Sequence, residues 1–251
     1  MRFLIKFSYD GTNFAGYQRQ PGLRTIQGCL EEALLKINNQ IPVVITATGR
    51  TDKGVHALEQ YAHLDLNVAI TPYKLKRALN SNLPDDIYVM DAKEVTDDYH
   101  IRQHVVQKTY QYRLNMATYN PLRRHYVYQH NYDLDVKKMQ EAIVYFVGTH
   151  DFRAFVTENY LKENCIRTIQ EAYITYDSYY PGELIFTFTG NGFMRYQVRN
   201  MVGLLLKVGN HKIEPLIVKE ILDSKVRGKH GCRAPSCGLC LVKVELDENI
   251  K

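Results

Sequence analysis

Apolar and polar side chains alternate at the start of the chain, where Phe3, Ile5 and Phe7 fall on one face of residues 1–9. A period of two is typical of a β-strand that buries one face. The same alternation, or a short run of β-branched residues, predicts three more strands in the first half of the chain. They cover residues 43–48, residues 58–66 with Leu58, Gln60, Ala62, Leu64 and Leu66 on one face, and residues 87–92.

Two segments between these strands repeat their apolar residues every three or four positions instead. Ile26, Leu30, Leu34 and Ile37 form one such stripe, which predicts an amphipathic helix with Thr25 as its N-cap. Residues 72–79 follow the same spacing, with a proline in the first turn. The first half therefore has the order β-α-β-β-α-β.

The second half repeats this order. Alternation predicts strands over residues 110–114, 172–176, 184–188 and 239–246, and Pro181-Gly182 marks a turn between two of them. Helical spacing predicts helices over residues 136–146 and 194–208, with Gly209 as the residue that follows the second helix, and a further short helix over residues 214–222. No residue-level repeat relates the two halves.

Two successive segments with the order β-α-β-β-α-β predict an α+β fold of two ferredoxin-like halves. We expect their mostly antiparallel sheets to join into one long curved sheet, with helices on one face and a basic active-site cleft on the other. The predicted N-terminal domain is 1–104 and the C-terminal domain is 105–251, because the residues around 100–108 are polar and basic.

Composition adds little to this picture. The 251 residues are 45% apolar and 24% charged, which is ordinary for a soluble globular protein. The net charge of +5 permits a polyanionic partner without requiring one. The 19 tyrosines could stack on bases or simply fill strand positions. No signal peptide or membrane span is predicted, and five cysteines without a secretion signal indicate reduced thiols in the cytoplasm.

Residues 48–57, with the sequence TGRTDKGVHA, place charges and two glycines between two predicted strands. Arg50 and Lys53 flank Asp52, and nearby cations favour an ionised carboxyl group. A nucleophile or an electrostatic stabiliser needs that state. A plain surface turn with one ion pair is the alternative.

This segment resembles the active-site motif of the tRNA pseudouridine synthase A (TruA) family, and further matches follow in order along nearly the whole chain. They are Tyr9-Asp10-Gly11 with Phe14, Gly16, Gln18 and Gln20; Thr25-Ile26-Gln27-Gly28; Ala78-Leu79-Asn80; Leu83-Pro84; His100 and Arg102; Lys108-Thr109-Tyr110 with Tyr112; residues 148–155; Gly192-Phe193 with Val198-Arg199-Asn200 and Gly203; and Ala234-Pro235 with Gly238-Leu239.

The resemblance implies an isomerase that breaks the glycosidic bond of uridine in tRNA, rotates the base and rejoins it through carbon. The expected targets are uridines in the anticodon stem-loop, at tRNA positions 38–40. An isomerisation adds and removes no atoms, so no cofactor or metal is expected. The expected partners are tRNA and a second copy of the chain, because members of the family act as homodimers.

The resemblance also assigns roles. Asp52 is the essential carboxylate, which could attack the anomeric carbon or stabilise charge there. The target nucleotide must swing out of the helix, and Arg50 is assigned to that flipping or to pairing with Asp52. Tyr110 would stack on the uracil and handle a proton, and Arg199, half buried, would pair with Asp52. The expected substrate-binding residues are Tyr110, Leu239, Thr51, His56, Arg24, Arg77 and Lys108.

The sequence departs from the family at Arg195-Tyr196, where a histidine is common, and at Lys53 and Tyr99. A cluster of His230, Cys232, Cys237 and Cys240 could hold zinc for a hydrolase, although its spacing favours simple thiols. A non-catalytic RNA-binding protein of the same fold is the other alternative.

Overall fold

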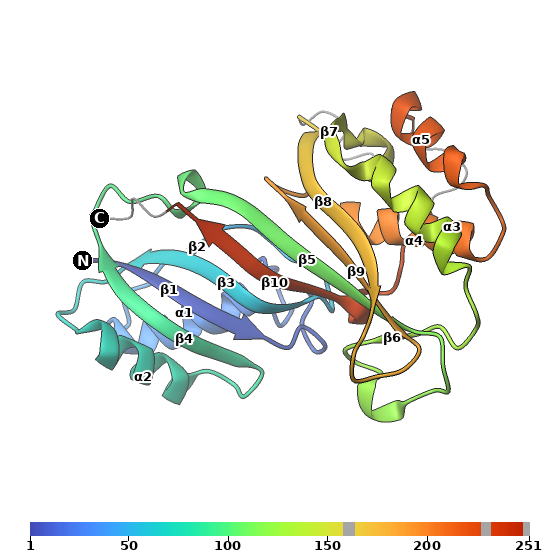
Figure 1. The fold of residues 1–251 in the computed structure, drawn as a ribbon. Helices are drawn as coiled ribbons and strands as arrows, with labels where there is room; N and C mark the ends of the chain where they lie inside the picture. Colours follow the sequence, from blue (N-terminus) through green and yellow to red (C-terminus); the bar gives the residue numbers. More distant parts are fainter. Residues whose placement is uncertain (158–163, 227–231, 248–251) are drawn as a thin grey trace. The chain divides into compact units, whose positions relative to one another are not determined.

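The computed structural model describes residues 1–157, 164–226 and 232–247. The strands are β1 (Arg2–Tyr9), β2 (Thr46–Ala47), β3 (His56–Asp65), β4 (Ile87–Val95), β5 (Val105–Asn115), β6 (Tyr128–Gln129), β7 (Gly148–Asp151), β8 (Ile166–Tyr176), β9 (Glu183–Gly190) and β10 (Leu239–Leu246). The α-helices are α1 (Ile26–Ile37), α2 (Pro72–Asn82), α3 (Val136–Ile143), α4 (Gln197–Gly209) and α5 (Pro215–Ser224). Figure 1 shows their arrangement.

The strands form one sheet of ten strands in the order β4-β1-β3-β10-β5-β9-β8-β7, with β2 paired to β3 and β6 paired to β5. Strand β5 runs parallel to β6, whereas β1 with β3 and β4, β2 with β3, β9 with β5 and β8, and β7 with β8 are antiparallel pairs. The predicted α+β class with a mostly antiparallel sheet is therefore confirmed. The chain divides into two compact units, which we call the first unit (Met1–Val106 with Leu241–Lys251) and the second unit (Gln107–Cys240).

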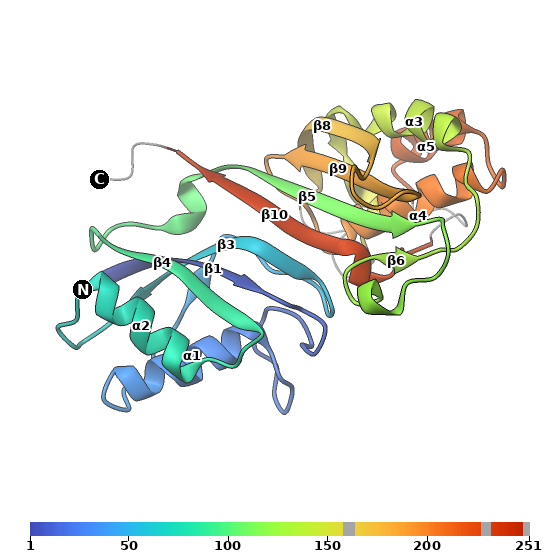
Figure 2. The ribbon, with the colours of Figure 1, turned by 60° about the horizontal axis from the view of Figure 1, so that its bottom comes forward.

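The first unit begins with the predicted order β-α-β-β-α-β. Strand β1 lies between β3 and β4, so that Ile5 pairs with Ala62 on one side and with Ala92 on the other. Helices α1 and α2 cover one face of these strands, as Figure 2 shows. Phe3, Ile5 and Phe7 are fully buried, as expected for the inward face of an alternating strand.

Helix α1 begins where the sequence predicts. Thr25 has an extended backbone, and its hydroxyl accepts a hydrogen bond from the backbone N–H of Gly28 at 3.2 Å. This bond satisfies one of the N–H groups that a helix leaves without a partner in its first turn. The predicted N-cap is therefore confirmed.

The predicted inward face of β3 is wrong at Leu58, whose side chain is 62% exposed. Strand β1 pairs Phe7 with Gln60 but Tyr9 with Ala57, so the register shifts between them. Such a bulge moves the residues on its far side to the other face of the strand. Ala57 is therefore buried where alternation alone placed Leu58. Strand β2 is also shorter than the predicted 43–48, since only Thr46 and Ala47 pair with β3.

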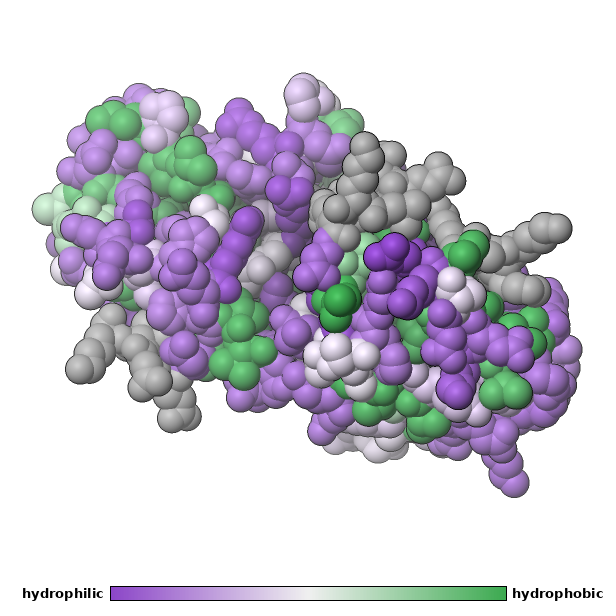
Figure 3. Space-filling model, turned by 90° about the horizontal axis from the view of Figure 1, so that it is seen from above, coloured by the Kyte–Doolittle hydropathy of each residue, from purple (hydrophilic) through white to green (hydrophobic). Residues whose placement is uncertain are grey.

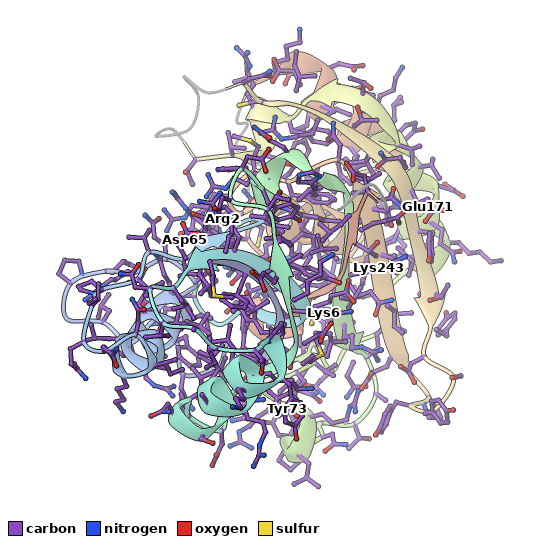
Figure 4. The ribbon with its side chains drawn as sticks, turned by 90° about the vertical axis from the view of Figure 1, so that its left-hand side faces the viewer. Arg2, Lys6, Asp65, Tyr73, Glu171 and Lys243 are labelled. Carbon is purple, nitrogen blue, oxygen red and sulfur yellow. The ribbon has the colours of Figure 1, made fainter. Side chains whose placement is uncertain are left out.

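The face of β1 that carries its even-numbered residues is partly polar. Arg2 of β1 makes two hydrogen bonds of 2.8 Å to the carboxylate of Asp65 on β3, a pair labelled in Figure 4. Beside this pair, Leu4 packs with Tyr99 and Ile101 in a small apolar cluster. This face is therefore closed at one end by the 3-10 turn of Ile101–Gln103 and its flanking residues.

In the second unit, β5 pairs with β9, β9 with β8, and β8 with β7, all antiparallel. Helix α3 contacts α4, α5 and β8. Phe146, Phe152, Phe155 and Phe188 pack their rings together in the core.

Three features of this unit differ from prediction. Strands β6 and β7 were not predicted, because segments of two and four residues are too short to set a pattern. Helix α4 begins at Gln197 rather than 194, because Tyr196 has a left-handed backbone with φ of 65° that a helix cannot continue. Gly209 is the last residue of this helix rather than the one after it.

None of the helices in the described part of the chain is long and apolar enough to cross a membrane. Figure 3 shows one face of the molecule, on which hydrophilic residues predominate and apolar residues gather only in small groups. The described surface in this view is therefore mainly polar.

Candidate active site

The loop predicted to carry the chemistry joins β2 to β3 in the first unit. The backbone N–H of Val55 donates to the carbonyl oxygen of Asp52 at 3.1 Å, and Gly54 has φ of 74°. A φ of this sign favours glycine. The loop therefore turns tightly directly after Asp52.

The segment that follows β1 packs against this loop at two glycines. A Cβ atom on Gly11 would lie 2.1 Å from the carbonyl oxygen of Val55, and one on Gly16 would lie 3.0 Å from that of Thr51. Gly16 also has φ of 111°. Only residues without side chains allow the two backbones to approach so closely. These are two of the glycines that carry the family resemblance.

Thr51 is anchored from two sides. Its hydroxyl lies 2.8 Å from the hydroxyl of Tyr9, and its carbonyl oxygen accepts a hydrogen bond from the backbone N–H of Tyr17 at 3.1 Å. The side chain is 8% exposed. The contacts of this residue hold the loop that carries Asp52.

His56 is buried at the start of β3. The backbone N–H of Gly11 donates to its Nδ1 at 3.1 Å, so in that state the ring is neutral and carries its proton on Nε2. An Asp10 carboxylate oxygen lies 3.1 Å from the same nitrogen and can accept a bond from it in a state that carries a proton on Nδ1. Both contacts join the motif to the segment that follows β1.

Gln60, which we did not predict as a functional residue, fixes the other end of the loop. Its side-chain oxygen accepts hydrogen bonds from the hydroxyl of Thr48 and from the N–H of Tyr61, and its amide donates to the carbonyl oxygen of Gly49 at 3.2 Å. The side chain is fully buried. A polar residue among the inward-facing positions of a strand is the signal that could have revealed it, since a buried amide needs partners.

Asp52 is half buried, whereas the flanking Arg50 and Lys53 are exposed. Neither cation makes an ion pair within residues 1–157, 164–226 and 232–247. The guanidinium of Arg50 is therefore exposed to solvent, two residues before the candidate catalytic Asp52 in the chain.

The two arginines expected to bind RNA in this unit differ in their surroundings. Arg24 binds both carboxylate oxygens of Asp86, at 2.7 and 2.8 Å, and its guanidinium lies 4.0 Å from the centre of the Phe14 ring. The bond to Asp86 raises the pKa of Arg24 above its ordinary value. Arg77 is exposed on α2, 5.8 Å from the Tyr73 ring.

In the second unit, Tyr110 lies on β5 opposite Phe188 and is half buried. Its ring meets the ring of Phe193 edge to face, with centres 5.2 Å apart. Lys108 lies two residues earlier on the same strand, opposite Gly190. The neighbouring Tyr112 is fully buried against Phe186, as a packing residue.

Arg199 is half buried on α4, as predicted. Its Nε donates to the carbonyl oxygen of Ala234 at 2.8 Å, and the N–H of Ala234 donates to the Arg199 carbonyl at 3.0 Å. Leu239 begins β10 and is 4% exposed. Within the second unit, these two hydrogen bonds join the segment before β10 to helix α4.

The cysteine cluster is only partly described, because His230 lies outside the described residues. Cys237 sits in a 3-10 turn and Cys240 in β10, and none of the five cysteines, all of them described, is in a disulfide. Within the described ranges, no group of three or more His, Cys, Asp or Glu side chains could hold a metal ion. Burial raises the pKa of the Cys237 thiol.

The fold and this loop define an α+β protein with an aspartate-centred candidate active site. Residues 5–102 and 142–247 match the family model described as tRNA pseudouridine synthase. A protein named tRNA pseudouridine synthase A from Streptococcus gordonii is 42% identical over 248 residues, which are 98% of this chain and 99% of that protein. Proteins of the same name from Streptococcus pyogenes serotypes M49 and M1 are 44% identical over 245 residues, 97% of this chain and 98% of theirs.

The chain belongs to the tRNA pseudouridine synthase family. The resemblance noted on its motifs is thereby confirmed, and so are the enzyme class, an isomerase, and tRNA modification as its activity.

Proposed function

We propose that this enzyme converts uridine to pseudouridine in the anticodon stem-loop of tRNA, with Asp52 as the nucleophile. In this reaction the bond between N1 of uracil and C1′ of ribose breaks, the base turns, and C5 bonds to C1′ instead. C5 loses a proton and N1 gains one, so no atom is added or removed overall. The chemistry can therefore proceed with side chains alone.

The observation that carries the proposal is the fixed loop around Asp52. A hydrogen bond between the hydroxyls of Thr51 and Tyr9 and one from the N–H of Tyr17 hold Thr51, and Gln60 holds Gly49. A carboxylate whose position is set before the substrate binds does not lose orientational freedom during the reaction. Such a carboxylate can attack C1′ or stabilise positive charge there, and a nucleophilic attack is the role that we favour.

The other catalytic roles follow the family resemblance. We propose that Arg50 helps the target nucleotide to leave the helix, since its side chain is exposed and it lies two residues before Asp52 in the same loop. Tyr110 is proposed to stack on the uracil, Arg199 to act with Asp52, and Leu239 to line the uracil pocket. These roles assume that the N-terminal domain (1–104) and the C-terminal domain (105–251), each ferredoxin-like, build the site together along a basic cleft.

Substrate binding is proposed for two further groups. Thr51 and His56 would serve by holding the loop, given their bonds to Tyr9 and Gly11. Lys108, Arg77 and Arg24 would contact tRNA phosphates, which gives affinity without sequence preference. For Arg24 this contact competes with Asp86. We also propose that the enzyme works in the cytoplasm as a homodimer.

Tritium release from tRNA labelled at C5 of uridine tests the proposal. The wild-type enzyme should release tritium, whereas Asp52→Ala should release none above background because the carboxylate is gone. Binding of tRNA, measured by filter retention, should stay within about threefold, since the substitution removes no cation. Release by Asp52→Ala at the wild-type rate would sink the assignment of the nucleophile.

The same assay separates the alternative, a non-catalytic RNA-binding protein of this fold. That protein would bind tRNA but release no tritium even as the wild type. An RNA-binding module has no use for an anchored carboxylate, so the loop around Asp52 favours the enzyme.

A further inference from the structure

Tyr196, where the sequence departs from the family, lies among three arginines of the second unit. The guanidinium carbon of Arg233 is 3.5 Å from the centre of the Tyr196 ring, that of Arg195 is 4.8 Å away, and that of Arg199 is 5.8 Å away. A tyrosine ring attracts cations through its negative faces. Three guanidinium groups at one ring nevertheless concentrate positive charge.

The backbone fixes this arrangement. Tyr196 stands in a left-handed conformation directly before α4, and the paired hydrogen bonds between Arg199 and Ala234 hold the segment that carries Arg233. Gly203 allows that segment to come close, because a Cβ atom there would lie 1.7 Å from the carbonyl oxygen of Cys232. The position of Arg233 over the ring therefore does not depend on its own side-chain bonds.

Two further arginines that stack closely on rings show what such a group usually binds. Arg24 lies over Phe14 and its N–H groups bind Asp86. Arg123 lies 3.6 Å from the Tyr180 ring and its N–H groups bind Glu183 at 2.7 and 2.9 Å. In both cases the aromatic ring holds the flat face of the guanidinium while the edge meets an anion.

Arg233 has the same stacking without the anion. Its side chain is exposed, and within residues 1–157, 164–226 and 232–247 it makes neither an ion pair nor a hydrogen bond. A guanidinium held in this way keeps its donors in a planar fork that fits two oxygens of a carboxylate or a phosphate.

The electrostatics of the neighbourhood favour an anion as well. Arg195 is exposed next to the ring, and the first turn of α4 contains no acidic residue. Arginines remain charged at any physiological pH, so the positive charge beside the ring does not vary with pH.

We propose that Arg233, Arg195 and Tyr196 form a binding site for a backbone phosphate of the RNA substrate. The ligand is a phosphodiester because the proposed function supplies RNA and because a phosphate has the oxygens that the fork requires. This inference rests on the proposed function. It adds a phosphate contact beside Arg199, one of the residues proposed to act in catalysis.

The salt dependence of tRNA binding tests this site. Each phosphate contact contributes about 0.7–0.9 to the slope of log K against log salt concentration. Arg233→Ala should therefore lower the slope by about that amount and weaken binding about fivefold to tenfold near physiological salt. Tyr196→Leu, which removes the ring but no charge, should weaken binding less and leave most of the slope.

Lys219→Ala is the matched control, because it removes one exposed cation of the second unit from another element, helix α5. It should keep both the affinity and the slope of the wild type. Arg233→Lys keeps the charge without the planar fork and should recover the slope but not the full affinity.

A slope for Arg233→Ala equal to that of the wild type would overturn the phosphate site. So would equal losses in Arg233→Ala and Lys219→Ala, since only the net charge would then matter. Failure of the proposed function would appear differently, as a wild-type enzyme that releases no tritium. Thermal melting of each variant confirms that the folded protein is compared.

Discussion

At the scale of single residues, the polar groups buried in the first unit decide how the loop is held. Gln60 occupies a position that alternation assigns to the core. Its side-chain amide forms hydrogen bonds with the hydroxyl of Thr48 and the carbonyl oxygen of Gly49. A buried hydrogen-bonding group without a partner costs free energy, so each end of this small network requires the other. Two of its members, Thr48 and Gly49, lie just before Arg50 and Asp52 in the chain.

Gln60→Leu should lower kcat for tritium release by at least about tenfold while KM changes little, because the loop loses its fixed position before the substrate binds. The free energy of unfolding should fall by about 1–3 kcal/mol, since a backbone carbonyl and a hydroxyl each lose a hydrogen bond. Steady-state kinetics and urea denaturation measure the two effects.

Gln140→Leu is the control for this prediction. It removes a hydrogen bond from a glutamine amide to the carbonyl oxygen of Ile174 in the second unit, and it should leave kcat unchanged. If Gln60→Leu lowers stability but keeps kcat, the residue supports the fold alone.

His63 is a second buried polar residue, and its titration should set part of the pH dependence of stability. Burial, followed by the charges of Arg2 and His100, lowers the pKa of His63 from 6.5 to about 4. Its Nδ1 also accepts a hydrogen bond from the N–H of Ile101, which protonation at that atom would break. The folded protein therefore keeps the ring neutral at a pH where the unfolded chain binds a proton.

The depressed pKa of His63 should lower the stability of the folded protein in acid. Above pH 6.5 His63 is neutral in both states and has no influence; between pH 6.5 and 4 the unfolded chain gains a proton that the folded protein does not. The free energy of unfolding should fall across this window, by about 2–3 kcal/mol at its lower end. His63→Gln should reduce the change in urea midpoint between pH 7 and pH 4.5. Equal pH profiles for the wild type and His63→Gln would contradict the prediction.

At the scale of elements, the loop between β2 and β3 and the segment after β1 act as one structure. Their backbones meet at Gly11 and Gly16, where no Cβ atom fits. A helix or strand of this protein can be predicted from its own pattern, but this contact joins residues about forty positions apart. Its consequence is that a change after β1 should disturb the residues around Asp52.

Gly11→Ala should lower the rate of tritium release by about tenfold or more. The added Cβ atom would lie 2.1 Å from the carbonyl oxygen of Val55, which is too close, so the turn after Asp52 would have to shift. Gly22→Ala is the matched control. Its φ of 71° makes alanine strained, but nothing lies within 4 Å of the added atom. Both variants should lose about 1 kcal/mol of stability or more, and only Gly11→Ala should lose activity. Similar rates for the two variants would refute the link between the segments.

At the scale of the whole molecule, the oligomeric state of the enzyme is a prediction that sedimentation can test. We expect the RNA-free enzyme to sediment with twice the chain mass of 29.2 kDa, as a homodimer. Sedimentation equilibrium at several protein concentrations measures this mass. A single-chain mass throughout the micromolar range would contradict the expected dimer.

Much of the fold could be predicted because its segments have strong local patterns. Strand β10 covers the predicted residues 239–246, and α1 begins after the predicted cap, Thr25. Strands β6 and β7 were not predicted because these short segments are extended only through pairing with neighbouring strands. Leu58 was assigned to the wrong face because the bulge depends on pairing with β1. The motif around Asp52 was visible in the sequence, whereas the roles of Gln60 and Tyr9 in holding it were not.

The sequence by itself determined the α+β class, most of the element positions and the enzyme family, since period, capping residues and motif spacing are local properties of the chain. Only the tertiary structure decided which side chains meet: Gln60 with Gly49, Gly11 with Val55, and Arg233 with Tyr196. The physical reason is that such contacts depend on register, left-handed turns and close backbone approach, which are fixed when distant segments pack and leave no periodic trace in the sequence.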